Sequence, residues 1–250
     1  MVDCLIAFGA NEGEPESNFR QVVESLQTVA GVEVTAVGEP CATEPIGGPA
    51  GQSAYLNASI RLSTTLLVEE LHQRLVEIEN ELGRERRARW GSRRVDLDLL
   101  LYGEQQTRTE QLSVPHPRMS FRRFVLEPSL KIAGGMTHPT SGKSIAQLLE
   151  HLSQRGNLAV WANASVEFVS SFKGSLQEHD HLKEWEVKQV SSLDQFGEVA
   201  SVAKLVVVFG ANDDKSRLVE NALKFAGPML DLRSSDQPME EVVAALKACM

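Results

Sequence analysis

The chain has 250 residues, a formal net charge of −9 at pH 7 and 42% hydrophobic residues. This length suits one large domain or two small ones, and the acidic balance argues against broad electrostatic binding to nucleic acid or to an anionic membrane. No run of 18 apolar residues and no basic leader segment is visible, so a cytoplasmic protein is expected. Cys4, Cys41 and Cys249 are widely spaced without a CxxC pair, so neither a disulfide framework nor a zinc site is expected.

The first half of the chain alternates between the periodicities of strands and helices. In chain order the pattern predicts a strand at Cys4–Gly9, a helix at Glu14–Ala30, strands at Val32–Val37 and Tyr55–Ser63, a helix at Leu66–Leu82 and a strand at Val95–Tyr102. The stretch EPIGGPAGQ is too rich in glycine and proline for either element and predicts a loop. The order β-α-β-β-α-β predicts an α+β fold with a ferredoxin-like core.

The second half predicts a small α/β domain with a partly parallel sheet. The expected elements are strands at Val166–Ser170, Trp185–Val190, Leu205–Phe209 and Met229–Leu232, and helices at Leu218–Ala226 and Pro238–Ala248, the last capped by Asp236. The stretch LVVVFGAND resembles LIAFGANEG near the start, but neither an arginine cluster nor a DxD strand follows it. We therefore interpret FGAN as a recurrent strand-to-helix turn, without chemistry in the second copy.

One stretch combines cations with carboxylates. RERRARWGSRRVDLDLL contains six arginines around Trp90, followed by Asp96 and Asp98. Residues two apart in a strand point to the same face, so the two carboxylates should lie side by side and need a neighbouring cation. Three interpretations are open: a solvated strand face paired with arginines, a nucleic-acid patch with Trp90 for stacking, or a site for Mg²⁺-complexed polyphosphate. The adjacent carboxylates weigh against nucleic acid, because they repel a phosphate backbone.

Four segments carry a family resemblance: FGANEG, EPIGGPAGQSAYLNAS, ELGRERRARWGSRRVDLDLLLYG and LSVPHPRMSFRRFVLEP. Together they resemble 6-hydroxymethyl-7,8-dihydropterin pyrophosphokinases, over about residues 3 to 153. This resemblance implies a transferase that moves diphosphate from ATP to a pterin alcohol in folate biosynthesis, with AMP as the other product. The combination RWGxRxxDLDLLL followed by VPHPRM is specific, whereas FGAN alone would be weak.

The resemblance also implies roles for individual residues. Two Mg²⁺ ions would bind Asp96 and Asp98, and the catalytic set would further include Arg84, Arg86, Arg89 and Arg93. ATP would contact Glu79, Arg84, Arg93, Leu99, His116 and Arg122. The pterin would contact Thr43, Ile46, Tyr55, Asn57, Trp90 and Phe124. Arg86 and Arg89 would lie in a loop that closes over the reactants.

Simpler interpretations stand beside these roles. His116, between Pro115 and Pro117, is compatible with a turn cap, and Tyr55 and Phe124 with ordinary core aromatics. The chain departs from the family pattern at Ala10, Glu44 and Pro117, and none of these departures removes an expected metal ligand or phosphate-binding arginine.

The expected division is a pyrophosphokinase domain at 1–153 and an α/β accessory domain at 154–250, through which a protein partner could bind. One alternative is a catalytically idle homologue that binds nucleotide or pterin and acts through its C-terminal domain as a regulator or scaffold. Another is an RNA-binding module, whose affinity would fall steeply with salt. No nucleic-acid or membrane partner is expected under the enzyme interpretation.

Overall fold

The structure, a computed structural model, describes residues 1–49, 51–83, 91–176, 179–210 and 216–250. The chain forms two compact units. The first comprises residues 1–119, 124–139 and 144–146, and the second comprises 120–123, 140–143 and 147–250. The division between kinase and accessory domain predicted at 153/154 stays a prediction; it lies near the end of helix α4 (Ile145–Gln154), which belongs to the second unit from Gln147 onward. No helix within the described ranges is long and apolar enough to cross a membrane.

An antiparallel sheet forms the centre of the first unit. Its strands are β1 (Val2–Ala10), β2 (Val32–Val37), β3 (Cys41–Thr43), β4 (Tyr55–Thr64) and β5 (Asp96–Tyr102). The order is β2-β4-β1-β5, and β3 pairs with the first three residues of β4. The predicted strands of this half are therefore present, and β3 is an addition. A short hairpin of β6 (Thr107–Arg108) and β7 (Ser113–Val114) follows β5.

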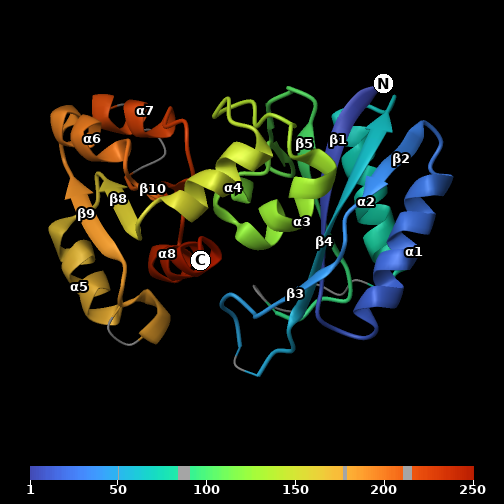
Figure 1. Cartoon of the computed structure of the whole chain (residues 1–250), viewed down its shortest axis with the longest axis horizontal. Coiled ribbons are helices and arrows are strands. Elements are labelled where there is room, and N and C mark those ends of the chain that lie inside the picture. Colours follow the sequence, from blue (N-terminus) through green and yellow to red (C-terminus); the bar gives the residue numbers. More distant parts are fainter. Residues whose placement is uncertain (50, 84–90, 177–178, 211–215) are drawn as a thin grey trace. The chain divides into compact units, whose positions relative to one another are not determined.

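Two helices cover one face of this sheet, as Figure 1 shows: α1 (Pro15–Thr28) and α2 (Val68–Glu81). Proline in the first turn starts α1, and the Glu70 carboxylate accepts the Leu67 N–H at 2.8 Å at the start of α2. Their apolar stripes bury Leu26, Leu71 and Leu75 against the even-numbered side chains of β1. Each such leucine contributes about 2 kcal/mol through burial of its side chain.

Helix α3 (Arg123–Ala133) lies on the opposite face of the sheet (Figure 1). Ser59 Oγ of β4 and Ser129 Oγ of α3 are 2.7 Å apart, and both side chains are buried. At the far end of the helix, Arg61 donates to the Ile132 carbonyl at 3.2 Å. The helix therefore covers the Ser59 and Arg61 part of this face, and Tyr55 and Asn57 lie further along β4.

The second unit is built on a four-stranded parallel sheet in the order β11-β10-β8-β9. Its strands are β8 (Leu158–Ala162), β9 (Glu186–Val190), β10 (Leu205–Val208) and β11 (Met229–Asp231). Every pairing in this sheet is parallel, which explains the uninterrupted apolar run LVVV in β10. Strand β8, which sequence reasoning missed, is central and buried.

Helices cover both faces of the parallel sheet. Figure 1 shows α6 (Leu193–Ala200) and α7 (Arg217–Leu223) on one side, and α5 (Val166–Leu176) and α8 (Pro238–Ala248) on the other. Phe196 and Val219 pack with Val160 and Val206 in the core under α6 and α7. Short 3₁₀ turns occur at Met119–Phe121 and Asp180–Leu182.

Two details of the predicted second half are wrong. Val166–Ser170 is the start of helix α5 and not a strand, because buried Val169, Phe172 and Leu176 recur at helical spacing after a Ser165 hydroxyl that accepts the Phe168 N–H. The run of β-branched and aromatic residues had suggested a strand. Helix α8 follows Gln237, not Asp236, at its N-cap position and has no side-chain cap.

Candidate active site

The predicted metal ligands lie on the face of the first sheet that α1 and α2 leave open. Asp96 and Asp98 alternate with buried Leu97 along β5, so the two carboxylates share one face. Asp96 is opposite Gly9 of β1, and Gly9 is opposite Asn57 of β4. Directly opposed residues in antiparallel strands project to the same side, so Asn57 shares the face of the carboxylates.

Arg93 supplies a cation to the first carboxylate. Its Nη1 atom forms an ion pair with Asp96 Oδ2, and both side chains are partly buried. Burial raises the pKa of the nearby Tyr55 phenol, Arg93 lowers that pKa and Asp96 raises it. The net shift of the Tyr55 pKa is upward, and Tyr55 lies close enough to Arg93 and Asp96 for both to affect it. The neutralisation expected for adjacent carboxylates is present at Asp96.

His116 faces the second carboxylate, with Nε2 3.7 Å from Asp98 Oδ2. Its main-chain N–H donates to the Leu100 carbonyl at 2.9 Å, and its Nδ1 accepts the Arg118 N–H at 3.2 Å. Because Nδ1 is an acceptor, the ring proton of neutral His116 is on Nε2, directed at Asp98. His116 is thus part of a turn, as the simpler interpretation held, and its ring also faces a predicted metal ligand.

Three predicted pterin contacts come together at β3 and β4. Thr43 is opposite Tyr55, and Asn57 Nδ2 donates to Thr43 Oγ1 at 2.7 Å. The Tyr55 hydroxyl donates to the Gly91 carbonyl at 3.1 Å. Thr43, Tyr55 and Asn57 lie on the same face as Asp96, since Tyr55 and Asn57 are two apart in one strand.

Glu79 is buried in the first unit, with 1% of its surface exposed. Its Oε1 accepts the Leu97 N–H at 2.6 Å, which ties the end of α2 to the strand residue between Asp96 and Asp98. This carboxylate therefore has a structural role in holding β5 in place. Leu99 is 4% exposed in the core beneath the helices, so only its main chain is available to a ligand on the open face.

The other predicted site residues have the following positions in the fold. Ile46 is partly buried in the loop after β3, and Phe124 lies in the first turn of α3. Arg122 belongs to the short segment that groups with the second unit. Arg84, Arg86, Arg89 and Trp90 lie outside the described residues.

The donor set fits Mg²⁺ that is shared with a substrate. Among the described residues there is no group of three or more His, Cys, Asp and Glu side chains that could enclose a metal. Mg²⁺ is commonly held by one or two carboxylates together with waters and substrate phosphate oxygens. The adjacent carboxylates of Asp96 and Asp98 suit that role better than an all-protein metal cage.

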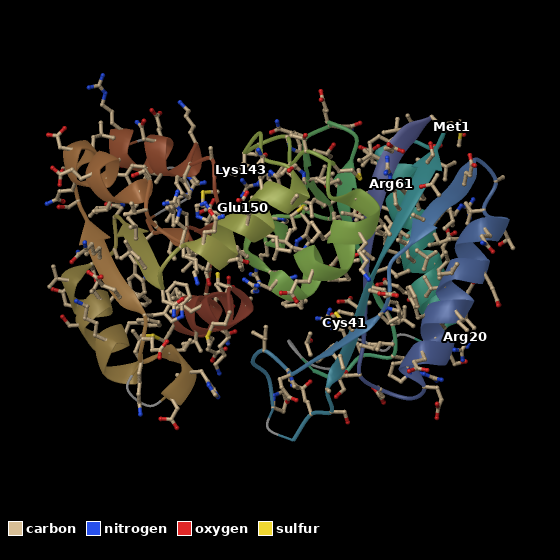
Figure 2. All side chains as sticks on the ribbon, viewed as in Figure 1. Met1, Arg20, Cys41, Arg61, Lys143 and Glu150 are labelled. Atoms are coloured by element: carbon tan, nitrogen blue, oxygen red, sulfur yellow. The ribbon has the colours of Figure 1, made fainter. Side chains whose placement is uncertain are left out.

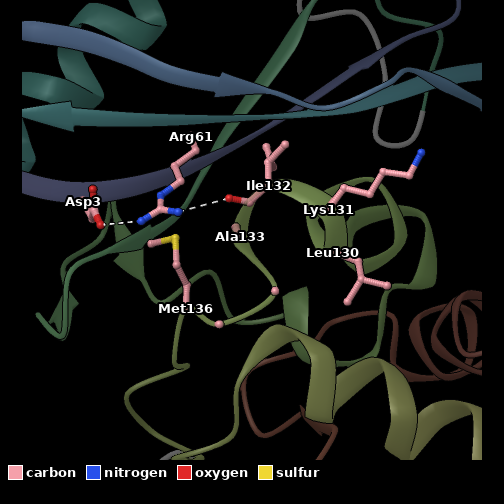
Figure 3. A pocket seen from close by; sticks show the side chains of 9 residues that line it. Asp3, Arg61, Leu130, Lys131, Ile132, Ala133 and Met136 are labelled. Atoms are coloured by element: carbon pink, nitrogen blue, oxygen red, sulfur yellow. Dashed lines mark hydrogen bonds and ion pairs between the residues drawn. The ribbon is translucent and has the colours of Figure 1, made fainter.

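A cavity of about 550 Å³ lies elsewhere in the first unit, between the start of β1 and the end of α3 (Figure 3). In it, Arg61 bridges the Asp3 carboxylate, at 2.8 Å, and the Ile132 carbonyl. Asp3 is six residues from Gly9 along β1, or about 20 Å at the usual rise of a strand. Figure 2 also shows Arg61 well separated from Cys41 of β3, so this cavity is not the predicted site.

Sequence reasoning missed two buried asparagines at the site. Asn11 follows β1 and bonds to the backbone of Arg93, and Asn18 in α1 donates to the Arg94 carbonyl at 3.0 Å. Asn11 is the asparagine of the FGAN segment, which was judged uninformative alone. The available signal was a polar residue directly after a buried strand, where it can bond to a neighbouring loop.

The chain is similar to known proteins over its first part. The family model described as 7,8-dihydro-6-hydroxymethylpterin-pyrophosphokinase (HPPK) matches residues 5–134. A 2-amino-4-hydroxy-6-hydroxymethyldihydropteridine pyrophosphokinase of Synechocystis sp. is 38% identical over 158 residues, which cover 63% of this chain and 78% of the relative. A protein of the same name from Bacillus subtilis is 46% identical over 129 residues, which cover 52% of this chain and 77% of the relative. One from Haemophilus influenzae is 34% identical over 141 residues, which cover 56% of this chain and 88% of the relative.

Proposed function

Because the chain belongs to the 7,8-dihydro-6-hydroxymethylpterin-pyrophosphokinase family, we propose that Asp96 and Asp98 hold two Mg²⁺ ions against the phosphates of ATP during catalysis. The reaction transfers diphosphate from ATP to the hydroxymethyl group of 6-hydroxymethyl-7,8-dihydropterin, and gives AMP and the pterin diphosphate for folate synthesis. The observation that carries the metal proposal is the adjacency of two carboxylates on one open sheet face, where Asp96 pairs with the Arg93 guanidinium and Asp98 lies beside the His116 imidazole.

The pterin side of the proposed site is Thr43, Tyr55 and Asn57. The bond to Thr43 uses one Nδ2 hydrogen of Asn57 and leaves its amide carbonyl oriented along the same face, where a pterin ring edge has donors to offer. Tyr55 offers an aromatic face and a hydroxyl anchored on Gly91. Ile46, Trp90 and Phe124 complete the proposed pterin contacts by analogy with the family.

The residues of the chain act by alignment and charge neutralisation. The pterin hydroxymethyl oxygen attacks the β-phosphorus and AMP leaves, so no protein nucleophile is needed. When bound, Mg²⁺ would neutralise negative charge on the phosphate oxygens during the transfer. Arg93 orients Asp96, His116 orients Asp98, and Glu79 fixes the strand between them. Arg84, Arg86, Arg89 and Arg122 are proposed to contact phosphates, and Leu99 to contact the nucleotide.

We also propose a split βαβ, ferredoxin-like description for the first unit and an accessory role for residues 154–250. The strand order β2-β4-β1-β5, with both helices on one face, supports the first proposal. For the second, the family match ends at residue 134, before β8 begins. The parallel sheet is therefore proposed as an accessory domain with a protein partner as its ligand.

The test combines an assay with a metal titration. The purified chain is mixed with ATP, Mg²⁺ and 6-hydroxymethyl-7,8-dihydropterin, and AMP and the pterin diphosphate are followed by mass spectrometry. Asp96→Asn and Asp98→Asn should lower turnover by more than about 100-fold and weaken Mn²⁺ binding in the presence of a non-hydrolysable ATP analogue, measured by electron paramagnetic resonance.

Asp3→Asn is the matched control, because it removes a carboxylate of the same sheet that pairs with Arg61 far from Gly9. It should leave both readouts unchanged. Wild-type Mn²⁺ binding in folded Asp96→Asn and Asp98→Asn variants would refute the metal assignment. Binding of both substrates by the unaltered chain without product would instead indicate the idle homologue.

A further inference from the structure

Asn11 forms hydrogen bonds with both polar groups of the Arg93 main chain. It is 7% exposed and directly follows β1. Its main-chain N–H donates to the Arg93 carbonyl at 2.9 Å, and its side-chain Oδ1 accepts the Arg93 N–H at 2.9 Å. The main-chain N–H and C=O groups of Arg93 therefore both bond to Asn11. Arg93 is the residue whose side chain pairs with Asp96.

The other end of the same amide reaches a different part of the site. Asn11 Nδ2 donates to the Ser53 carbonyl at 3.2 Å and lies 3.5 Å from Gln52 Oε1. Gln52 Nε2 in turn donates to the carbonyls of Gly47 and Pro49, each at 3.2 Å. We name Gly47, Pro49, Gln52 and Ser53 the Gln52 loop. This loop lies between Ile46 and Tyr55, two proposed pterin contacts.

The orientation of the Asn11 amide follows from chemistry. The Arg93 N–H can only donate and the Ser53 carbonyl can only accept, so the oxygen of the amide must face Arg93 and its nitrogen must face Ser53. A carboxylate in place of the amide would keep the first bond and oppose the second, because it would present an oxygen to a carbonyl oxygen. The two contacts of Asn11 can thus be separated by a single substitution.

We propose that Asn11 is a positioning residue that ties the Gln52 loop, on the pterin side, to the Arg93 backbone, on the phosphate side. This proposal rests on the proposed function, because the proposed function identifies which side of the site binds pterin and which binds phosphate. Asn11 touches neither reactant; it sets the distance between the segments that hold them. Alignment of two substrates is the main demand of this reaction, so a residue that joins both binding segments acts on catalysis through them.

Asn18 offers a matched control within the same protein. It is 4% exposed and its Nδ2 donates to the Arg94 carbonyl, next to Arg93, and among the described residues it has no hydrogen bond to the Gln52 loop. Asn18→Asp opposes two oxygens in the same way as Asn11→Asp, at a neighbouring residue. A purely structural role predicts similar consequences for the two variants, whereas the proposed tie predicts a difference in the Gln52 loop and in pterin binding.

The experiment compares Asn11→Asp, Asn18→Asp and the unaltered full-length chain by steady-state kinetics and by hydrogen–deuterium exchange. Asn11→Asp should raise the KM for the pterin about 10-fold, the effect of one lost hydrogen bond and an opposed oxygen pair, and leave the KM for ATP within about 2-fold. Amides of the Gln52 loop should exchange faster in Asn11→Asp and not in Asn18→Asp.

Unchanged exchange in the Gln52 loop of Asn11→Asp, or equal rises in both KM values, would overturn the proposal. Gln52→Ala is a second route to the same question, since it releases the carbonyls of Gly47 and Pro49 and leaves the Asn11–Arg93 bonds intact. It should reproduce the faster exchange and the selective rise in pterin KM. Failure of the metal proposal would appear separately, as Mn²⁺ binding retained in Asp96→Asn, while the exchange measurement would still report on Asn11.

Discussion

Asn57 and Asp96 face the same residue, Gly9, from its two sides in the sheet. Two strand spacings separate them, which is about 10 Å. Because Gly9 has no side chain, no side chain stands between the amide on the pterin side and the carboxylate on the phosphate side. The proposed site is therefore a row across three strands, with its centre formed by bare backbone.

Gly9→Ala tests whether this bare centre is needed. A Cβ atom at Gly9 would lie 3.5 Å from Asn57 Oδ1, an ordinary van der Waals contact, and Gly9 lies in a regular strand. The variant should fold with a Tm within about 3 °C of the unaltered chain, since the cost of an accommodated methyl group is small. Its kcat/KM should fall by about 10-fold or more, because the methyl group enters the space of the reactants.

Gly156→Ala serves as the control for this change, because a Cβ atom at Gly156 meets nothing within 4 Å. It should leave kcat/KM unchanged. An unaltered kcat/KM in Gly9→Ala would show that the reactants do not pass over this part of β1.

His116 variants should separate the two contacts of its ring. His116→Gln can keep a donor towards Asp98 but loses the acceptor for the Arg118 N–H, and His116→Asn has the opposite effect. If the contact with Asp98 matters for metal binding, kcat should fall about 10- to 100-fold in His116→Asn and less in His116→Gln. Steady-state kinetics at several Mg²⁺ concentrations measure this; the reverse order would show that the turn contact matters more.

Stability should decline in mild acid partly through His151. Burial lowers the pKa of this histidine below the ordinary value of 6.5, an effect larger than the opposing bond from Nε2 to the Ala203 carbonyl at 2.9 Å. The unfolded chain therefore binds the proton more readily, so this contribution to stability is complete above pH 6.5 and is lost as the pH falls below it. Burial lowers the pKa of His138 as well, with the same sign.

His151→Gln keeps a donor for Ala203 and removes the titration. Urea midpoints measured at pH 5 and pH 7.5 should differ less in this variant than in the unaltered chain. An identical pH dependence in His151→Gln would assign the acid sensitivity to other groups.

Removal of residues 154–250 tests the accessory role. A chain ending at Ser153 should keep kcat/KM within about 3-fold if residues 1–153 hold the complete site. It should also be less stable, because Leu148 and Leu152 of α4 are fully buried and belong to the second unit, most of which the shortened chain lacks. Circular dichroism confirms folding and the product assay measures turnover. Loss of turnover in a folded shortened chain would show that residues 154–250 are needed for a complete site.

Local pattern was sufficient for the first sheet and for the charged constellation. The residue pattern along Tyr55–Ser63 and Val95–Tyr102 predicted β4 and β5 almost to the residue. In the first half of β5, Leu97 and Leu99 are buried while Asp96 and Asp98 are partly exposed, as alternation predicts. The same alternation placed Asp96 and Asp98 on one face. In the second half, Val166–Ser170 misled because its residue types favour strands. In the helix that forms instead, Phe168 and Phe172 pack against buried Trp161 of β8.

The sequence did not predict which distant segments pair with one another. Asn57 and Asp96 are brought to one row by the register of β4 and β5 on β1, and nothing local to either residue specifies that register. The bonds from Asn11 to Arg93 and Ser53 join segments 82 and 42 residues apart, so they exist only once the sheet has formed. Residue types and spacing determined the chemistry that this chain can perform; the tertiary structure decided which groups meet, because hydrogen bonds and ion pairs act over a few ångströms of space and not along the chain.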